Sequence, residues 1–361
     1  MALQSTRVTL VPDNAGLLMA AAAAFACVGC VTPHAAHSQP APAEEPRRVI
    51  IVSFDGLRPD AIDAASATTL QRLIAGGSYD PDCRNEFPPS TLPNHASMVT
   101  GKPVCDHRVF LNIELDGYID STTIFELATR AGRRAAFFAG KNKLGYLCRP
   151  ESVAVRVIDD NMDIMADAVI AAFASRPPDL SFIHFRHPDG AGHQFGWMSD
   201  EYLEHTRQVD KLLERIMKGI SDAGVDDATF IITSDHGGQG KAHFLDTPAE
   251  RNVPFIMYGP GIAAGRVIGV QMHVRDVAPI AAVLLGLEVP DSWRSAFPEE
   301  VRTPPPATQQ GESKSAAPGK CGRGAAGAGL TSLVAMTPAQ SGRRRSRRRM
   351  ARSGVAWRRR T

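Results

Sequence analysis

Short apolar runs alternate with amphipathic segments through the middle of this 361-residue chain. The runs have little polar alternation, which is typical of strands that are buried on both faces of a parallel sheet. They cover residues 49–54, 135–139, 153–158, 180–185, 229–233 and 253–258. Strands that alternate with helices predict an α/β fold with a doubly wound, mostly parallel sheet and helices on both faces.

Four longer segments between and after these runs have the spacing of amphipathic helices. The clearest covers residues 200–222, where apolar side chains fall on one stripe. The others cover residues 123–132, 161–175 and 277–287. No internal repeat is visible, so we expect one α/β domain with a single core over residues 49–302. The composition, 43% hydrophobic and 22% charged, excludes collagen-like, coiled-coil and wholly disordered chains.

The N-terminal part of the chain differs from this body. Residues 15–31 carry no charge, and this stretch is shorter than the ~20 apolar residues that a membrane-spanning helix needs. Small residues at positions 24–26 fit a cleavage site, so we interpret residues 1–30 as a signal peptide or an N-terminal anchor. Residues 31–48 are rich in Ala and Pro and are interpreted as a linker. We therefore expect an exported protein, periplasmic or secreted, either free or held at the membrane by its N-terminus.

The net charge of +2 conceals an uneven distribution. Residues 49–302 include 24 basic and 34 acidic residues, whereas residues 303–361 include 13 basic residues and one acidic residue. The tail lacks the apolar periodicity of a core, so we expect residues 303–361 to be disordered. Arginine runs can bind anionic lipid or nucleic acid. Trp357 is the only aromatic residue in the tail, so we expect no specific nucleic-acid binding.

The cysteines do not indicate a zinc site of their own, because the three in the body, Cys83, Cys105 and Cys148, form no CxxC pair. In an exported protein Cys83 and Cys105 could form a disulfide, and the sequence leaves this open. Cys27 or Cys30 could carry a lipid after cleavage. The sequence does not indicate an oligomeric state.

Acidic and histidine residues follow three of the predicted strands. The carboxyl ends of parallel strands meet at one edge of such a sheet, where functional residues collect. The residues at these ends are Asp55, then Asp189 and His193, then Asp235 and His236, with His243 seven positions further on. Asp and His together suit zinc or manganese, and six such ligands are too many for one tetrahedral zinc but right for two. Taken singly, Asp189 could cap a turn and His243 could lie in a surface loop.

A hydroxyl group lies at the start of a further predicted helix. Pro88 and Pro89 precede Ser90 and Thr91, and residues 92–99 have a helical pattern. A hydroxyl at a helix start lies beside free backbone N–H groups and the positive end of the helix dipole, which favour a phosphoryl oxygen. Thr91 could also be the helix N-cap, and the two roles are compatible.

Five segments together resemble the alkaline phosphatase superfamily, and within it the type I phosphodiesterase/nucleotide pyrophosphatase branch. They are VSFDGLRPD at Asp55, STLPNHASMVTG at Thr91, PDGAGH at Asp189 and His193, SDHGG at Asp235 and His236, and the YGPG at 258–261 that follows His243. The resemblance covers the whole body in the order of the family.

The resemblance implies two divalent metal ions, most commonly Zn²⁺, held by two groups of side chains. One group would be Asp55, Asp235, His236 and the Thr91 oxygen, and the other Asp189, His193 and His243. It also implies that Thr91 attacks phosphorus and forms a phosphothreonine intermediate. Asn112 falls where the family places an asparagine that binds a non-bridging phosphoryl oxygen. The remaining histidines, His95 and His184 among them, are expected to bind no metal.

The implied function is hydrolysis of a small phosphodiester or pyrophosphate, with a nucleotide-like or lipid-head-group substrate. Nucleotide-cleaving members often have an aromatic residue after the nucleophile, and Leu92 in that position leaves the nucleotide preference open. A phosphomonoesterase is the first alternative, because Arg58, Arg84, Arg108, Lys141 and Lys143 are possible phosphate contacts. A non-catalytic, metal-stabilised binding protein with an anion-binding tail is the second. The chain has no C/S-x-P-x-R segment of the kind that sulfatases need.

Overall fold

The computed structural model describes residues 9–10, 48–293, 297–298 and 301–302. Apart from residues 9–10 and Arg48, the predicted signal peptide or anchor (1–30), linker (31–48) and tail (303–361) lie outside the described residues. No helix among the described residues combines the length and the apolar character needed to cross a membrane. Cys83 is buried and Cys105 is exposed, and the structure does not contain a disulfide between them.

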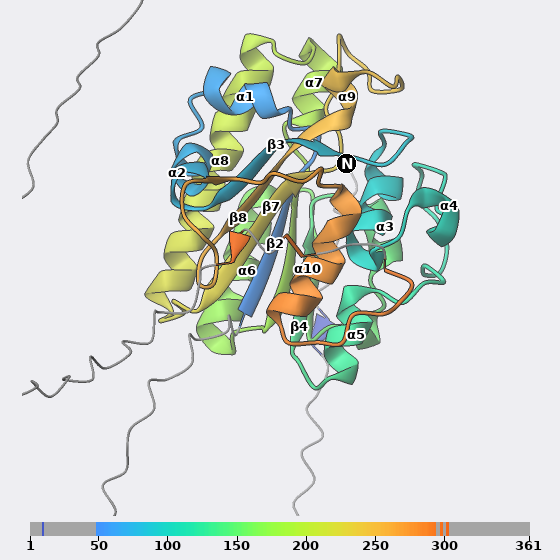
Figure 1. Ribbon diagram of the computed structural model, residues 1–361, viewed down its shortest axis with the longest axis vertical. Helices are drawn as coiled ribbons and strands as arrows, with labels where there is room; N and C mark the ends of the chain where they lie inside the picture. Colours follow the sequence, from blue (N-terminus) through green and yellow to red (C-terminus); the bar gives the residue numbers. More distant parts are fainter. Residues whose placement is uncertain (1–8, 11–47, 294–296, 299–300, 303–361) are drawn as a thin grey trace, which may run out of the picture. The chain divides into compact units, whose positions relative to one another are not determined.

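A mixed sheet of nine strands runs through the described part of the chain (Figure 1). The strands occur in the order β1-β5-β4-β6-β2-β7-β8-β3-β9. Their bounds are Thr9–Leu10 (β1), Arg48–Phe54 (β2), Ser78–Arg84 (β3), Ala135–Ala139 (β4), Val155–Ile158 (β5), Leu180–Phe185 (β6), Ala228–Ser234 (β7), Asn252–Tyr258 (β8) and Arg266–Val267 (β9). All six predicted strands are present, and the predicted doubly wound, mostly parallel sheet is confirmed at its centre.

The sheet is parallel from β5 to β7, whereas β1 pairs antiparallel with β5, and beyond β7 two antiparallel pairs are followed by β9, which pairs parallel with β3. β8 pairs antiparallel with β7, and β3 pairs antiparallel with β8. β3 was not expected from the sequence, because its segment SYDPDCR contains a proline and several polar residues. Such a composition is tolerated near a sheet edge, where fewer backbone groups need a partner and one face can meet solvent. A register shift between Asp80 and Cys83 accommodates Pro81.

Helices cover both faces of the sheet (Figure 1). On one side lie α1 (Pro59–Ala64), α2 (Thr68–Gly76), α6 (Met162–Ser175) and α8 (Asp200–Asp222), and on the other lie α3 (Thr91–Thr100), α5 (Ile124–Arg130) and α10 (Val277–Leu284). Shorter helices are α4 (Val104–His107), α7 (Asp189–Phe195), α9 (Pro248–Arg251) and the 3₁₀ turns Asn142–Leu147, Pro150–Ser152 and Val274–Asp276. In place of the single core expected from the sequence, the sheet has one cluster of buried side chains on each face. β2 contributes to both, because Ile50 and Val52 pack on the first side while Val49 and Ile51 pack on the second.

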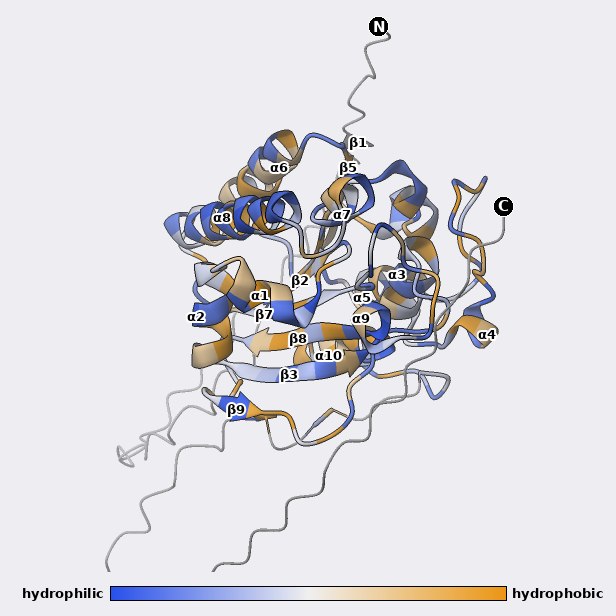
Figure 2. Cartoon of the chain, turned by 90° about the horizontal axis from the view of Figure 1, so that it is seen from above, coloured by the Kyte–Doolittle hydropathy of each residue, from blue (hydrophilic) through white to orange (hydrophobic). Residues whose placement is uncertain are grey.

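The predicted helices at 123–132, 161–175, 200–222 and 277–287 are all present, and α8 has the predicted bounds. Ser199 caps α8 by accepting the Tyr202 N–H, and Asn161 caps α6 by accepting two N–H groups. Figure 2 shows α8 with hydrophilic residues along much of its outer surface, as its stripe predicts. α1, α2 and α7 were not predicted. α7 is short and glycine-rich, and it begins at one of the predicted metal ligands.

Candidate metal centre

The site forms where β2 ends between its two neighbours. Phe54, the last residue of β2, is paired with Phe185 of β6 and with Ser234 of β7. Asp55 and Asp235 therefore leave adjacent strands side by side, and the Gly56 N–H donates to Asp235 Oδ1 at 3.0 Å. β6 leads into α7 after three residues, and the Asp189 N–H donates to the Asp55 carbonyl at 2.8 Å. Backbone hydrogen bonds thus hold all three carboxylates at the same edge of the sheet.

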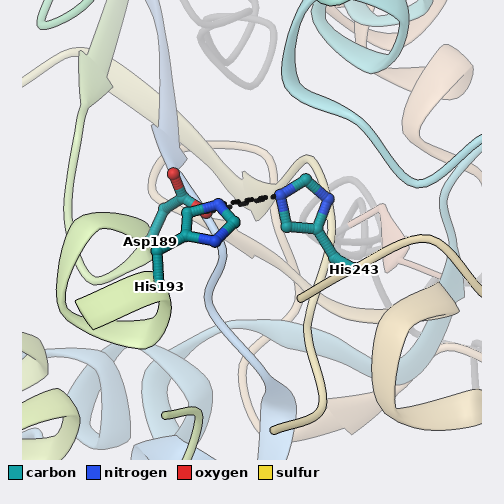
Figure 3. Close-up of side chains that lie close together, drawn as sticks. All are labelled: Asp189, His193 and His243. Carbon is teal, nitrogen blue, oxygen red and sulfur yellow. Dashed lines mark hydrogen bonds and ion pairs between the residues drawn. The ribbon is translucent and has the colours of Figure 1, made fainter. Parts of the chain in front are cut away.

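Asp189, His193 and His243 form one group at this edge (Figure 3). His193 lies one turn after Asp189 on α7, and its Nε2 is 3.3 Å from Asp189 Oδ1. His243 Nε2 lies 3.8 Å from the same oxygen and 3.1 Å from His193 Nε2. Each histidine Nδ1 faces a carbonyl, that of Lys241 for His193 and that of Pro89 for His243. A carbonyl can only accept, so in the neutral rings Nδ1 holds the proton and both Nε2 lone pairs point at one another.

A second group surrounds His236. Its Nε2 is 3.4 Å from Asp235 Oδ2, 3.6 Å from Asp55 Oδ1 and 4.0 Å from Asp189 Oδ1. Its Nδ1 donates to the Gly237 carbonyl at 2.8 Å, so Nε2 again keeps its lone pair in the neutral ring. Asp189 Oδ1 is thus close to histidines of both groups. The structure brings the six predicted Asp and His ligands into one continuous cluster, with Asp189 between its two halves.

Several buried atoms of this cluster have no hydrogen-bond partner among the described residues. They are Asp55 Oδ1, Asp189 Oδ1, Asp235 Oδ2 and His236 Nε2. A buried polar atom without a partner is costly, and three carboxylate oxygens beside imidazole lone pairs repel one another unless positive charge lies between them. A mixed set of carboxylate oxygens and imidazole nitrogens is the donor set of zinc or manganese. The residues present therefore fit divalent metal ions.

The pKa values of the cluster follow from burial and neighbouring charge. Burial raises the pKa of Asp55, but Lys141 and then His184 outweigh it and hold that pKa well below its ordinary value. Burial and the nearby Asp55 raise the pKa of Asp235. Burial, aided by the adjacent His236, lowers the pKa of His243 to about 4, so its ring is neutral near pH 7. A neutral imidazole is the form that binds a metal.

Thr91 is buried at the first position of α3. The N-cap is Ser90, whose side chain makes no capping hydrogen bond, so the alternative role of Thr91 as N-cap does not hold. His243 binds the carbonyl of Pro89, two residues before Thr91. His95 Nδ1 donates to the Thr91 carbonyl at 2.8 Å and lies 3.5 Å from Asp235 Oδ2. The first turn of α3 is therefore held against the cluster of carboxylates.

Asn112 follows α3 in the chain, and its side chain contacts the first turn of that helix. Its Oδ1 accepts the Leu92 N–H at 3.0 Å and is 2.9 Å from Lys143 Nζ. Leu92 is fully buried, so it offers no surface on which a base could stack. The structure thus brings Thr91 and Asn112 to the same helix terminus.

Two residues contact the carboxylates of the site directly: His184, which sequence reasoning did not assign to it, and Lys141, which was predicted only as a possible phosphate contact. His184, on β6, donates from Nε2 to Asp55 Oδ2 at 2.9 Å. Lys141 Nζ is 2.7 Å from Asp55 Oδ2 and 2.7 Å from Asp189 Oδ2, and these carboxylates raise the pKa of Lys141 despite its burial. Lys141 follows β4 by two residues, so the rule that located the acids at strand ends would also have located it. His184 lies inside a buried apolar strand, where only the register with Ser53 reveals its position.

A family model described as type I phosphodiesterase / nucleotide pyrophosphatase matches residues 49–252. The chain is 28% identical over 217 residues to human ectonucleotide pyrophosphatase/phosphodiesterase family member 7, covering 53% of this chain and 47% of that protein. It is 26% identical over 216 residues to the Xenopus laevis bis(5'-adenosyl)-triphosphatase enpp4, covering 53% of this chain and 47% of that protein. The chain spans about half the length of these curated relatives.

The fold is also found among solved structures. An inactive variant of murine ectonucleotide pyrophosphatase/phosphodiesterase 5, in complex with AMP, has a TM-score of 0.63 at 16% identity and covers 71% of this chain and 100% of that chain. The 2-O GAG sulfatase BT1596 has a TM-score of 0.57 at 16% identity, covering 69% of this chain and 72% of that chain. At these identities the likeness shows the fold alone, and the expected alkaline phosphatase-like fold is confirmed.

Proposed function

Because the chain belongs to the type I phosphodiesterase/nucleotide pyrophosphatase family of the alkaline phosphatase superfamily, we propose that it hydrolyses phosphodiester or pyrophosphate bonds with two metal ions and a threonine nucleophile. One observation carries this function. Unpartnered buried atoms of Asp55, Asp189, Asp235 and His236 converge beside the helix terminus that holds Thr91. Such a site combines ligands for cations with a hydroxyl group and free backbone N–H groups, which together suit the attack on a phosphoryl group.

We assign two zinc ions to the cluster. The first is held by Asp55, Asp235, His236 and the Thr91 oxygen, and the second by Asp189, His193 and His243. When bound, the two cations lower the pKa of a hydroxyl group and stabilise negative charge on the phosphoryl and leaving oxygens. The hydrogen bonds from His193, His236 and His243 to backbone carbonyls support this assignment, because they orient each ring with its Nε2 toward the carboxylates.

The residues of the chain supply the nucleophile and orient the substrate. Thr91 Oγ1 attacks phosphorus, and its bond to phosphorus forms as the bond to the leaving oxygen breaks. The leaving oxygen takes up a proton, and water then replaces Thr91 on phosphorus and restores its hydroxyl group. Two in-line displacements give net retention of configuration at phosphorus. Asn112 Oδ1 already accepts the Leu92 N–H, which leaves its NH₂ group to donate to a non-bridging oxygen.

The proposed substrate is a small phosphodiester of the nucleotide-like or lipid-head-group class. Large apolar side chains flank two site residues and are exposed, Leu111 and Ile113 beside Asn112 and Phe244 beside His243. These side chains can contact a base or an apolar chain on the leaving group. We also propose that the protein is exported, free or anchored through its N-terminus. The uncharged residues 15–31 and the similarity to ectonucleotide pyrophosphatase/phosphodiesterases support this proposal.

Metal removal and substitution of Thr91 test this function together. We expect the zinc-loaded full chain to hydrolyse bis(p-nitrophenyl) phosphate, excess chelator to abolish the rate, and added zinc to restore it. Thr91→Ala should lower kcat by at least about 10³-fold because it removes the attacking hydroxyl group, while metal content stays near two per chain.

Ser90→Ala is the matched control, because it removes the adjacent hydroxyl group and should retain the rate. Full activity in excess chelator would contradict the two-metal proposal. An active Thr91→Ala variant would show that another group attacks phosphorus.

A further inference from the structure

Trp197 lies where three segments that carry predicted metal ligands meet. It follows α7 by two residues and is buried. Its indole Nε1 donates to the Gly56 carbonyl at 2.9 Å, and Gly56 directly follows Asp55. Its backbone N–H donates at 2.7 Å to the carbonyl of Gly240, three residues before His243. Trp197 is therefore bonded both to the end of β2 and to the loop that follows β7.

The indole contacts the rings of two predicted metal ligands. Its centroid lies 5.1 Å from that of His193 and 5.7 Å from that of His243, and the rings meet edge to face at 84° and 72°. A carbonyl holds the Nδ1 atom of each histidine, which leaves the ring able to swing about that hydrogen bond. A second contact with the ring removes that freedom. The indole is thus placed to keep both Nε2 atoms beside Asp189 Oδ1, where Figure 3 shows them.

Two glycines leave room for the indole. Gly192 directly precedes His193, and Gly238 lies two residues after His236. A Cβ at Gly192 would lie 2.7 Å from indole Cδ2 and Cε2, and a Cβ at Gly238 would lie 2.2 Å from the same two atoms. Both distances are far below the ~3.5 Å that separates carbon atoms in contact. The indole is therefore packed against the backbone of two ligand-bearing segments, and a side chain at either glycine would displace it.

Tyr202, on α8, also fixes the indole. Its ring centroid is 6.2 Å from that of Trp197, and its hydroxyl donates to the same Gly56 carbonyl at 2.9 Å. A rigid side chain in a close-packed environment transmits its position to the groups that it touches. The indole is thereby fixed by residues that are not predicted metal ligands, and it can hold the ligands beside it in place.

We propose that Trp197 is a positioning residue of the metal centre, and that its indole holds His193 and His243 in the orientation in which they bind a divalent ion together with Asp189. The inference rests on the proposed function, because it uses the metal ligands assigned there. Rings that are already oriented lose less conformational freedom when a cation binds, so the affinity for the cation rises. In this role Trp197 is not itself a ligand.

Zinc binding by the full chain, freed of metal, tests this role. Calorimetry follows the two binding steps, and His243→Ala identifies the step that belongs to Asp189, His193 and His243. In Trp197→Leu the affinity of that step should fall by at least about tenfold, because the rings are no longer oriented. The other step should change little. Trp197→Phe keeps an aromatic ring but loses the hydrogen bond to Gly56, so its affinity should lie between the two.

Excess zinc separates positioning from a general loss of structure. Trp197→Leu keeps every predicted ligand, so saturating zinc should restore most of its rate on bis(p-nitrophenyl) phosphate. Trp293→Leu is the matched control. Trp293 is also buried and also packs on a glycine, but that glycine is Gly101, at the opposite end of α3 from Thr91. Trp293→Leu should lower the melting temperature and leave both zinc affinities unchanged.

Tryptophan emission gives a spectroscopic readout. The chain has three tryptophans, so Trp293→Phe combined with Trp357→Phe leaves Trp197 as its single tryptophan. Co²⁺ binds sites of imidazole and carboxylate ligands, and it quenches the emission of an adjacent indole. We expect the emission of this variant to fall as Co²⁺ binds. With His243→Ala added, the same fall should need at least about tenfold more Co²⁺.

The outcomes separate this inference from the proposed function. In a folded Trp197→Leu variant, unchanged zinc affinity or an equal loss at both steps would overturn the role of Trp197, as would emission that bound Co²⁺ does not quench. A wild-type chain that binds two zinc ions but does not hydrolyse the diester would overturn the proposed function alone. A chain that binds no zinc would overturn both. If the melting temperature shows that Trp197→Leu has not folded, Trp197→Phe and the single-tryptophan variant still decide.

Discussion

The two oxygens of Asp55 have different partners. Oδ2 accepts from His184 Nε2 and is paired with Lys141, whereas Oδ1 has no donor and lies 3.6 Å from His236 Nε2. Lys141 and His184 keep the pKa of Asp55 low, so the carboxyl group is ionised through the neutral pH range. One oxygen is thereby fixed by the protein while the other is left for a cation. Sequence reasoning identified the ligand but not the two residues that orient it.

Gly56 controls the distance between Asp55 and Asp189. It has a φ of +75°, and a Cβ there would lie 2.9 Å from both Cα and Cβ of Asp189. Its carbonyl accepts from Trp197 Nε1 and from the Tyr202 hydroxyl, each at 2.9 Å. The backbone at Gly56 is thus held from one side while Asp189 packs against the other. A larger residue would have to displace Asp189.

We expect Gly56→Ala to lower both the free energy of unfolding and the zinc content. Gly132→Ala is the matched control, because Gly132 has a φ of +74° and no atom lies within 4 Å of a Cβ placed there. A left-handed conformation costs a non-glycine residue about 1–2 kcal/mol, and both variants should show that loss in chemical denaturation. Only Gly56→Ala should also lose zinc. Equal zinc content in the two variants would contradict the proposed packing role of Gly56.

At the scale of the elements, a contact between two helices supplies an N-terminal cap that the sequence of α2 does not provide. α2 has no side-chain cap of its own, since its N-cap is Ala67. The buried carboxylate of Asp210, on α8, instead accepts the N–H groups of Thr69 and Leu70 at 2.9 and 2.8 Å. Burial raises the pKa of Asp210, and these two hydrogen bonds oppose that rise. One helix therefore caps another across about 140 residues of sequence.

Asp210→Ala should lower the free energy of unfolding by about 2 kcal/mol, because it leaves two buried N–H groups without an acceptor. Asp210→Asn keeps one carbonyl oxygen and should lose less. Glu214→Ala changes an exposed residue one turn further along α8 and should stay within about 0.5 kcal/mol of the wild type. Chemical denaturation at pH 7 measures all three. If Asp210→Ala and Glu214→Ala behave alike, α2 does not depend on this cap.

At the scale of the whole molecule, the core extends almost to the predicted tail. Val301 is fully buried and packs in the same core as α3, α5 and α10. Its carbonyl accepts the Ala263 N–H at 2.7 Å, and the backbone of Arg302 forms an isolated antiparallel β-bridge with that of Ile262. The described residues of the candidate site all lie between residues 53 and 250.

Removal of residues 303–361 should therefore leave the rate on small substrates and the melting temperature unchanged. A chain that ends at Pro298 is the matched control, because it also loses Val301. Burial of a valine side chain contributes about 1.5–3 kcal/mol, so this shorter chain should melt several degrees lower. A large loss of rate in the chain that ends at Arg302 would show that the tail contributes to the folded enzyme.

Sequence patterns predicted six of the strands, the helices α5, α6, α8 and α10, and the residues to which the proposed chemistry is assigned. Apolar periodicity and strand ends are local features, so they can be read within one segment. How those residues combine depends on the three-dimensional fold. It placed Asp189 between two groups, directed Lys141 and His184 to Asp55, paired Lys143 with Asn112 and added the antiparallel strand β3. These contacts join residues far apart in the chain, 129 positions in the case of His184 and Asp55. Strand order and register, which no local pattern specifies, bring them together.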